Sequence, residues 1–110
     1  MNTETKRALE ASIRHWERLT SGKRKSGEGH YAQDCALCKI FHKPNPNNDD
    51  LYICDGCPVA ERTGCYECRG TPWRHVDRAF FEKESYSTAG FKSAAKKMLR
   101  FLKSLRPKSK

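Results

Sequence analysis

Six cysteines arranged as three Cys-x-x-Cys pairs constrain this chain more than any other feature. A two-residue gap lets a tight turn direct both thiolates at one point, and two such turns supply the four soft ligands of a tetrahedral Zn²⁺. The first two pairs read C-x2-C-x15-C-x2-C, which lies within the spacing range of four-cysteine zinc sites. The sequence therefore predicts one structural zinc ion. The pairs are Cys35/Cys38, Cys54/Cys57 and Cys65/Cys68.

The ligand set stays open, because six thiols exceed the four that one tetrahedral ion takes. The first two pairs can close the site alone, Cys68 can replace Cys54 or Cys57, or the third pair can replace the second. In each case the remaining thiols are spare. His30 and His42 flank the first pair closely enough to substitute as ligands, although we interpret both as solvated loop histidines. The candidate ligands are four of Cys35, Cys38, Cys54, Cys57 and Cys68.

Disulfide bonds and an iron–sulfur cluster are the competing explanations for the cysteines. Small secreted domains use disulfides, but the N-terminal segment MNTETKRALEASIRHWERL lacks the apolar core and cleavage site of a secretory signal. The compact cysteine run of ferredoxins is also absent. No apolar run reaches the length of about eighteen residues that spans a bilayer. We therefore expect a reducing cytoplasm and no membrane.

The length of 110 residues and a hydrophobic content of 36% predict one domain with a small core. Structural zinc would compensate for that core, since its binding is coupled to folding. We expect a small α-rich zinc-stapled domain: an N-terminal helix, zinc-knuckle or ribbon-like loops with short strands, and two C-terminal helices.

Helical periodicity predicts three helices, at residues 3–19, 72–84 and 88–106. Thr71 and Pro72 are suited to begin the second, and Pro107 to end the third. Their apolar stripes are Leu9, Ile13, Trp16 and Leu19; Val76, Ala79 and Phe80, with Lys83 on the same side; and Phe91, Ala94, Ala95, Met98, Leu102 and Leu105.

Three segments without helical periodicity complete the domain. Residues 20–33 are rich in Gly and Ser and predict a mobile basic linker. Residues 34–71 form the zinc module, in which 43–50 have the turn chemistry of a loop before a short strand, Leu51–Ile53. Residues 107–110 are a polar tail.

Positive charge is concentrated at the C-terminus. From Lys92 onward there are eight Lys or Arg and no Asp or Glu. This segment therefore carries nearly all of the chain's net charge of +9. A basic helix face can bind phosphate backbones and release counterions, although it can equally be a solvated surface. The candidate nucleic-acid contacts are Lys23, Arg24, Lys25, Lys92, Lys96, Arg100 and Lys103.

The second cysteine pair continues as Cys54-Asp-Gly-Cys57-Pro58-Val59, and Cys68 is followed by Arg69-Gly70-Thr71-Pro72-Trp73. These and two shorter strings resemble a group of small uncharacterised proteins of bacteriophages and prophages. This resemblance implies a phage-type metal-binding protein in the cytoplasm of a bacterial host. The family pattern has no cysteine where Cys65 stands, which implies that Cys65 is a spare thiol. The similar strings are Cys35-Ala-Leu-Cys38, Cys54-Asp-Gly-Cys57-Pro58-Val59, Thr63-Gly64 and Cys68-Arg69-Gly70-Thr71-Pro72-Trp73.

We expect no enzyme and no small-molecule substrate. An all-cysteine zinc site is closed, whereas catalytic zinc keeps an open position, and no His-Glu-x-x-His, His-x-Glu or phosphate-loop motif is present. Two hypotheses follow. The first is an accessory protein that binds nucleic acid through the basic helix. The second is an interaction module or inhibitor of a host enzyme or defence complex, displaying Trp73, Tyr66 and the Asn/Asp loop.

Overall fold

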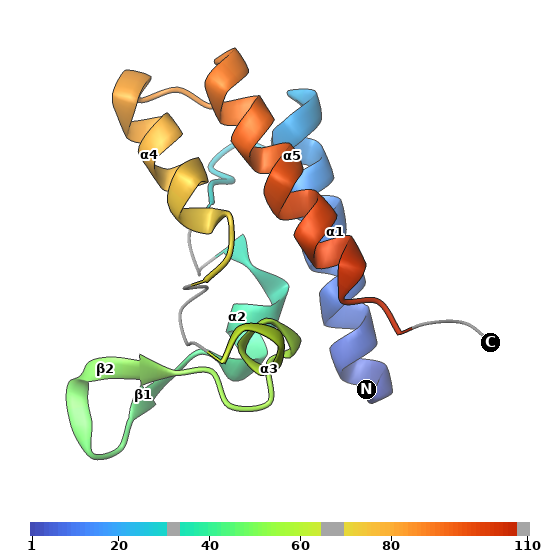
Figure 1. Cartoon of the computed structure of the whole chain (residues 1–110), viewed down its shortest axis with the longest axis vertical. Helices are drawn as coiled ribbons and strands as arrows, with labels where there is room; N and C mark the ends of the chain where they lie inside the picture. Colours follow the sequence, from blue (N-terminus) through green and yellow to red (C-terminus); the bar gives the residue numbers. More distant parts are fainter. Residues whose placement is uncertain (31–33, 65–69, 108–110) are drawn as a thin grey trace.

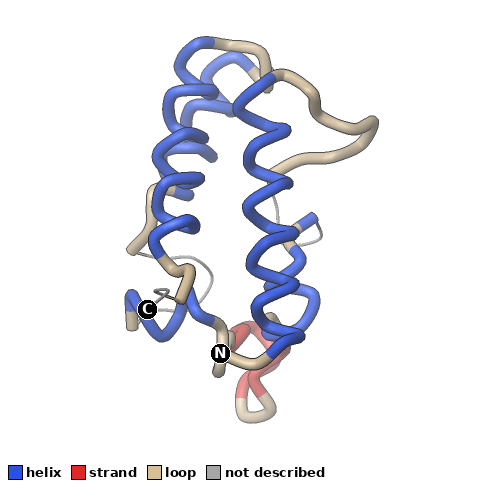
Figure 2. The backbone as a smooth tube through the Cα atoms, turned by 90° about the vertical axis from the view of Figure 1, so that its right-hand side faces the viewer, coloured by secondary structure: helices blue, strands red, loops and turns tan. Residues whose placement is uncertain are grey.

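The computed structural model describes residues 1–30, 34–64 and 70–107, which form a helix-rich domain. Two long antiparallel helices, α1 and α5, lie side by side, and α4 packs on the other flank of α5 (Figure 1). Two short helices and a β-hairpin lie together at one end of the long helices in both views (Figures 1 and 2). This confirms the prediction of a small α-rich domain. The elements are α1 (Thr3–Ser21), α2 (Ala36–Phe41), β1 (Lys43–Asn45), β2 (Asn48–Ile53), α3 (Pro58–Thr63), α4 (Trp73–Lys83) and α5 (Ala89–Ser104).

Helix α1 carries the apolar stripe that the periodicity predicted. The side chain of Asn2 caps its start by accepting a hydrogen bond from the Thr5 amide at 2.7 Å. Its end lies two residues beyond the predicted 3–19, because Gly22 provides the left-handed cap at φ 77°. Leu9, Ile13, Trp16 and Leu19 are all buried, which confirms their predicted place in the core.

Helices α4 and α5 are close to their predicted ranges. The hydroxyl of Thr88 caps α5 by accepting from the Phe91 amide at 3.0 Å, and the buried residues match the predicted stripe. The helix ends at Ser104, before the proline that was expected to end it. On α4, Val76 is fully buried, but Lys83 is exposed. Lys83 lies seven residues after Val76 and so on the predicted side, but it is exposed because it is the last residue of its helix, next to the left-handed Glu84.

The central module contains more regular structure than expected. The predicted loop 43–50 is instead part of the antiparallel β1–β2 hairpin, which pairs Lys43 with Ile53 and Pro44 with Tyr52. Helices α2 and α3 were not predicted, because six residues are too few to establish a periodic pattern. Both begin directly after a cysteine, Cys35 and Cys57 respectively.

The segment between α1 and α2 is tied to the helices rather than free. Thr20 and Ser21 belong to α1, and Glu28, Gly29 and His30 are buried. The prediction of a mobile linker over 20–33 is therefore wrong for its described part, residues 20–30. We call residues 22–30 the strap. Among the described residues, no helix has the length and apolar character needed to cross a bilayer.

Candidate functional site

The first cysteine pair lies at the start of α2. Cys35 occupies the N-cap position, and its thiol shares a hydrogen bond with that of Cys38. This hydrogen bond, together with burial, raises the pKa of Cys35 well above its usual value. Ser12 of α1 holds the pair in place: its hydroxyl lies 3.8 Å from the Cys35 sulfur and accepts from the Leu37 amide at 3.4 Å.

The second pair forms a tight turn before α3. The Cys57 amide donates to the Cys54 carbonyl at 3.0 Å, and Gly56 allows the turn by adopting φ 86°. The amides of Ala60 and Val59 donate toward the Cys57 thiol. Burial nevertheless raises the pKa of Cys57, so the neutral thiol is the stable form without a cation.

The hairpin brings the two pairs toward each other. Its Lys43–Ile53 pairing places the end of α2 beside the residue that precedes Cys54. The turn then packs on α2, because a Cβ placed on Gly56 would lie 3.2 Å from the Phe41 ring. After burial, the proximity of Cys35 and Cys54 also raises the pKa of the Cys57 thiol, so three thiols from two elements lie in one region.

The donor chemistry at this junction fits a zinc ion, although the side chains are not gathered into a ligand cluster. Within the described residues, no three His, Cys, Asp or Glu side chains are grouped closely enough to hold a metal. No disulfide joins Cys35, Cys38, Cys54 or Cys57, and amides already donate to sulfur at both helix starts. Cys65 and Cys68 lie outside the described residues, so their predicted assignments remain predictions.

The two histidines near the first pair have different environments. His30 is 2% exposed and therefore is not the solvated loop residue we expected. Its Nε2 donates to Asp77 Oδ1 at 2.7 Å, and the Tyr86 hydroxyl lies 3.2 Å from its Nδ1. The surrounding rings of α4 and α5 explain its burial. His42 is half-buried at the C-cap of α2.

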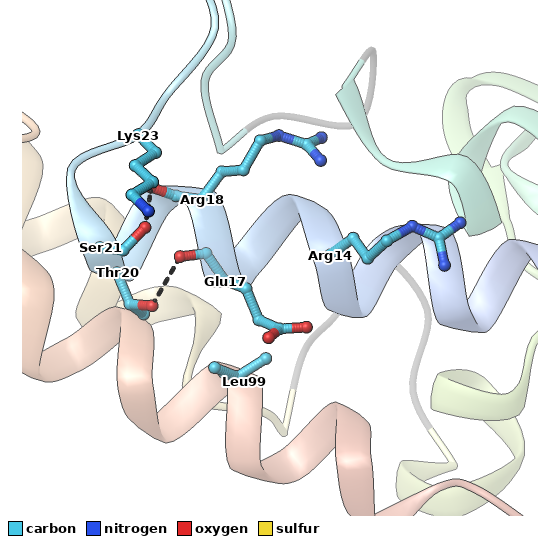
Figure 3. Close-up of a pocket in the computed structure, with 7 residues that line it drawn as sticks. All are labelled: Arg14, Glu17, Arg18, Thr20, Ser21, Lys23 and Leu99. Atoms are coloured by element: carbon cyan, nitrogen blue, oxygen red, sulfur yellow. Dashed lines mark hydrogen bonds between the residues drawn. The ribbon is translucent and has the colours of Figure 1, made fainter.

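A groove of roughly 450 Å³ runs between α1 and α5 (Figure 3). Its walls combine cationic side chains with one glutamate and one leucine. Beyond the groove, toward the C-terminal end of α5, Arg106 forms an exposed ion pair with Glu10 at 2.7 Å. The lining residues are Arg14, Glu17, Arg18, Thr20, Ser21, Lys23 and Leu99.

Of the predicted basic set, Lys23 lines this groove, and three lysines of α5 share a helix flank with Leu99, which also lines it. Lys92, Lys96, Leu99 and Lys103 are spaced four, three and four residues apart, so they share one flank of α5, and Leu99 lines the groove. Lys92 contacts the α1 end, since its Nζ lies 3.5 Å from a Cβ placed on Gly22. Lys96, Lys103 and Arg100 are exposed. Each step of four residues turns about 40° around the helix, so Arg100, two such steps from Lys92, lies further toward the outer side of α5.

In the strap, Arg24, one of the predicted nucleic-acid contacts, makes contacts within the protein instead. Arg24 Nη1 donates to the Glu28 carbonyl at 2.7 Å, and its guanidinium carbon lies 4.7 Å from the centre of the Tyr86 ring. The side chains of Lys23 and Lys25 are exposed. Sequence reasoning missed Arg14 and Arg18, because single arginines on an amphipathic helix carry no signal of which groove they line.

Glu28 anchors the strap to α1. It accepts from His15 Nδ1 at 2.5 Å, from Arg18 Nη2 at 2.7 Å and from the Lys25 amide at 3.0 Å. Burial by itself would raise the pKa of Glu28, but the hydrogen bonds from Arg18, Lys25 and His15 lower it to about 2. Nothing in the sequence distinguished this glutamate, since its side-chain partners, His15 and Arg18, are thirteen and ten residues away.

Trp73 is half-buried, with its indole N–H donating to the His30 carbonyl at 2.6 Å. Its polar edge therefore joins α4 to the strap, and it is not the fully displayed aromatic that the interaction-module hypothesis assumed. Tyr66 lies outside the described residues, and so does its predicted display. In the described part of the Asn/Asp loop, Pro46 and Asn47 are exposed, and the interaction-module hypothesis stays a prediction.

Comparison with known proteins gives no family to this chain: no family model, curated protein or solved structure matches it.

Proposed function

We propose that this chain is a small zinc-stapled protein that binds nucleic acid through the basic flank of α5 and the adjoining end of α1. One observation carries this proposal: Lys92, Lys96 and Lys103 lie along the same flank of α5, and Lys92 meets the α1 end beside Lys23. After Glu84 the chain contains no acidic residue, so nothing on α5 neutralises this row.

A row of lysines on a helix favours phosphate contacts without base specificity. Successive cations three or four residues apart follow one helix flank, where they can meet successive phosphates and release counterions. The donors in this row are lysine ammonium groups. They bind phosphates as point charges, whereas the guanidinium of arginine forms paired hydrogen bonds that can also recognise base edges. Sequence-tolerant, salt-sensitive binding is the expected behaviour.

A zinc ion held by Cys35, Cys38, Cys54 and Cys57 would serve as a structural staple between α2 and α3. Two observations support this ligand set: both pairs stand at helix starts with amides donating to sulfur, and the hairpin brings them into one neighbourhood. An all-thiolate site is closed to substrate and supplies folding energy rather than catalysis.

The test is a salt titration of binding to a fluorescent duplex of arbitrary sequence. The full chain should bind at about 50 mM salt, and the log–log salt slope should be near –0.9 for each phosphate contact. Reversing two exposed lysines of the α5 row, Lys96→Glu and Lys103→Glu, should lower both the affinity and the slope.

The matched control reverses two exposed lysines on α2 and β1, Lys39→Glu and Lys43→Glu. It changes the net charge equally, so it should weaken binding much less if the α5 row is the contact surface. If both variants lost the same duplex affinity, the loss would come from net charge alone and not from the α5 row. Absence of binding by the unaltered chain would reject the proposal.

A further inference from the structure

The outer face of α4 displays a large aromatic ring to solvent. Phe81 is 57% exposed, and Met1 is the only other large apolar side chain with comparable exposure in the described part of the chain. Its neighbour Phe80 is half-buried and packs against Tyr86 and His30. A large exposed apolar side chain can contribute to a binding surface when other recognition groups lie beside it.

A continuous set of ring contacts holds Phe81 in place. Its ring meets Phe80 edge-on, with centroids 5.5 Å apart, and Phe80 stacks on Tyr86 at 4.4 Å. Arg24 of the strap lies over the Tyr86 ring. Because Phe80 of α4 and Tyr86, in the segment between α4 and α5, both pack against the core, Phe81 is presented by an ordered support. A pre-ordered ring loses little conformational entropy when a ligand stacks on it.

Two arginines share the face of α4 that carries Phe81. Arg74 and Arg78 precede it by seven and three residues, which places all three side chains along one helix face. Both arginines are exposed, and within the described residues neither forms an ion pair. The carboxylate between them in sequence, Asp77, is bonded to His30. The face therefore combines one open ring with two cations.

From this combination we infer that Phe81, Arg74 and Arg78 form a stacking platform for single-stranded nucleic acid. An unpaired base offers its π-face to an exposed ring, whereas the bases of a duplex are already stacked on each other. The arginines can contact the phosphates on either side of the stacked base. The inference rests on the proposed nucleic-acid function and adds a preference for single strands. The platform lies on α4, so it is separate from the lysine row of α5.

The experiment measures fluorescence anisotropy of a labelled oligothymidylate of about 15 nucleotides and of a duplex, each with the full chain. Phe81→Ala should weaken binding to the single strand by about 5- to 100-fold, and leave its salt slope and the binding of duplex unchanged. Phe81→Trp should retain single-strand affinity, because the ring is kept. Arg74→Gln with Arg78→Gln should lower both the affinity and the slope.

The outcomes separate this inference from the proposed function. If Phe81→Ala binds the single strand as tightly as the unaltered chain while Lys96→Glu/Lys103→Glu loses binding, the platform is wrong and the α5 row stands. If Phe81→Ala weakens duplex and single strand equally, stacking is not the cause and the platform is also wrong. If the unaltered chain binds neither probe, both proposals fail.

Discussion

The ion network around Glu28 gives the sharpest test of how this fold is held together. Glu28 is 8% exposed and joins the strap to α1 through His15 and Arg18. Replacing it by glutamine, Glu28→Gln, keeps the size of the side chain and removes its charge. Arg18 then loses its ion-pair partner, and a buried site loses its compensating negative charge.

The magnitude follows from the pKa of Glu28, which falls from 4.5 to about 2. Each pKa unit corresponds to about 1.4 kcal/mol, so the folded state favours the charged form by about 3 kcal/mol. Because the pKa is lowered on folding, this stability is fully present above pH 4.5 and is lost as the pH falls toward 2. Glutamine can retain part of the hydrogen bonding, so we expect Glu28→Gln to lower the free energy of unfolding by about 2–3 kcal/mol at pH 7.

Two measurements check this prediction. Urea unfolding at pH 7 gives the loss in stability, with exposed Glu82→Gln as the control, which should change stability by less than about 0.5 kcal/mol. Carboxyl ¹³C NMR gives the titration of Glu28 in the folded protein. Its shift should stay nearly constant from pH 7 to pH 4.5, where an unperturbed glutamate would be half protonated. A titration midpoint near 4.5, or a Glu28→Gln variant as stable as Glu82→Gln, would refute the reasoning.

Three further predictions concern the metal, the strap and the core. The purified chain should contain close to one zinc by elemental analysis. Cys38→Ser should release the zinc and unfold the central module, which circular dichroism would detect. If Cys65→Ser had the same effect, the assignment of Cys65 as a spare thiol would be wrong. Gly29→Ala should lower the free energy of unfolding, measured in urea, by about 1–3 kcal/mol, because the new Cβ would lie 2.6 Å from the Tyr86 hydroxyl. Gly90→Ala, with open space around it, is the control, and similar losses in both variants would contradict the clash. Phe91→Ala should cost about 3–5 kcal/mol because the ring is fully buried, and a loss below about 1 kcal/mol would place it outside the core.

The three long helices could be predicted because their information is local. An apolar residue every three or four positions defines one face, and that face must be buried wherever the helix packs. Leu9, Ile13, Trp16 and Leu19 on α1 are buried as their spacing required. Lys83 shares the helix side of Val76 but is exposed, because a helix terminus can leave its last side chain outside the core.

The candidate metal centre was only partly accessible from the sequence. Cysteine spacing identified the paired thiols, since the geometry of a two-residue turn is local. It could not choose among the ligand sets, because that choice depends on which pairs the chain brings together. The β1–β2 hairpin, in the segment expected to be a loop, pairs Lys43 with Ile53 and so brings the residue before Cys54 near the end of α2.

By itself, then, the sequence determined the amphipathic helices, the thiol pairs and the excess of positive charge near the C-terminus. Only the tertiary structure decided that Glu28 and His30 are buried, that Arg24 lies on an aromatic ring, and that α1 supplies cations to the groove beside α5. The physical reason is the range of the interactions. Helix periodicity and turn geometry act within a few residues, whereas burial of a charge depends on partners such as Asp77, which is 47 positions from His30 in the chain.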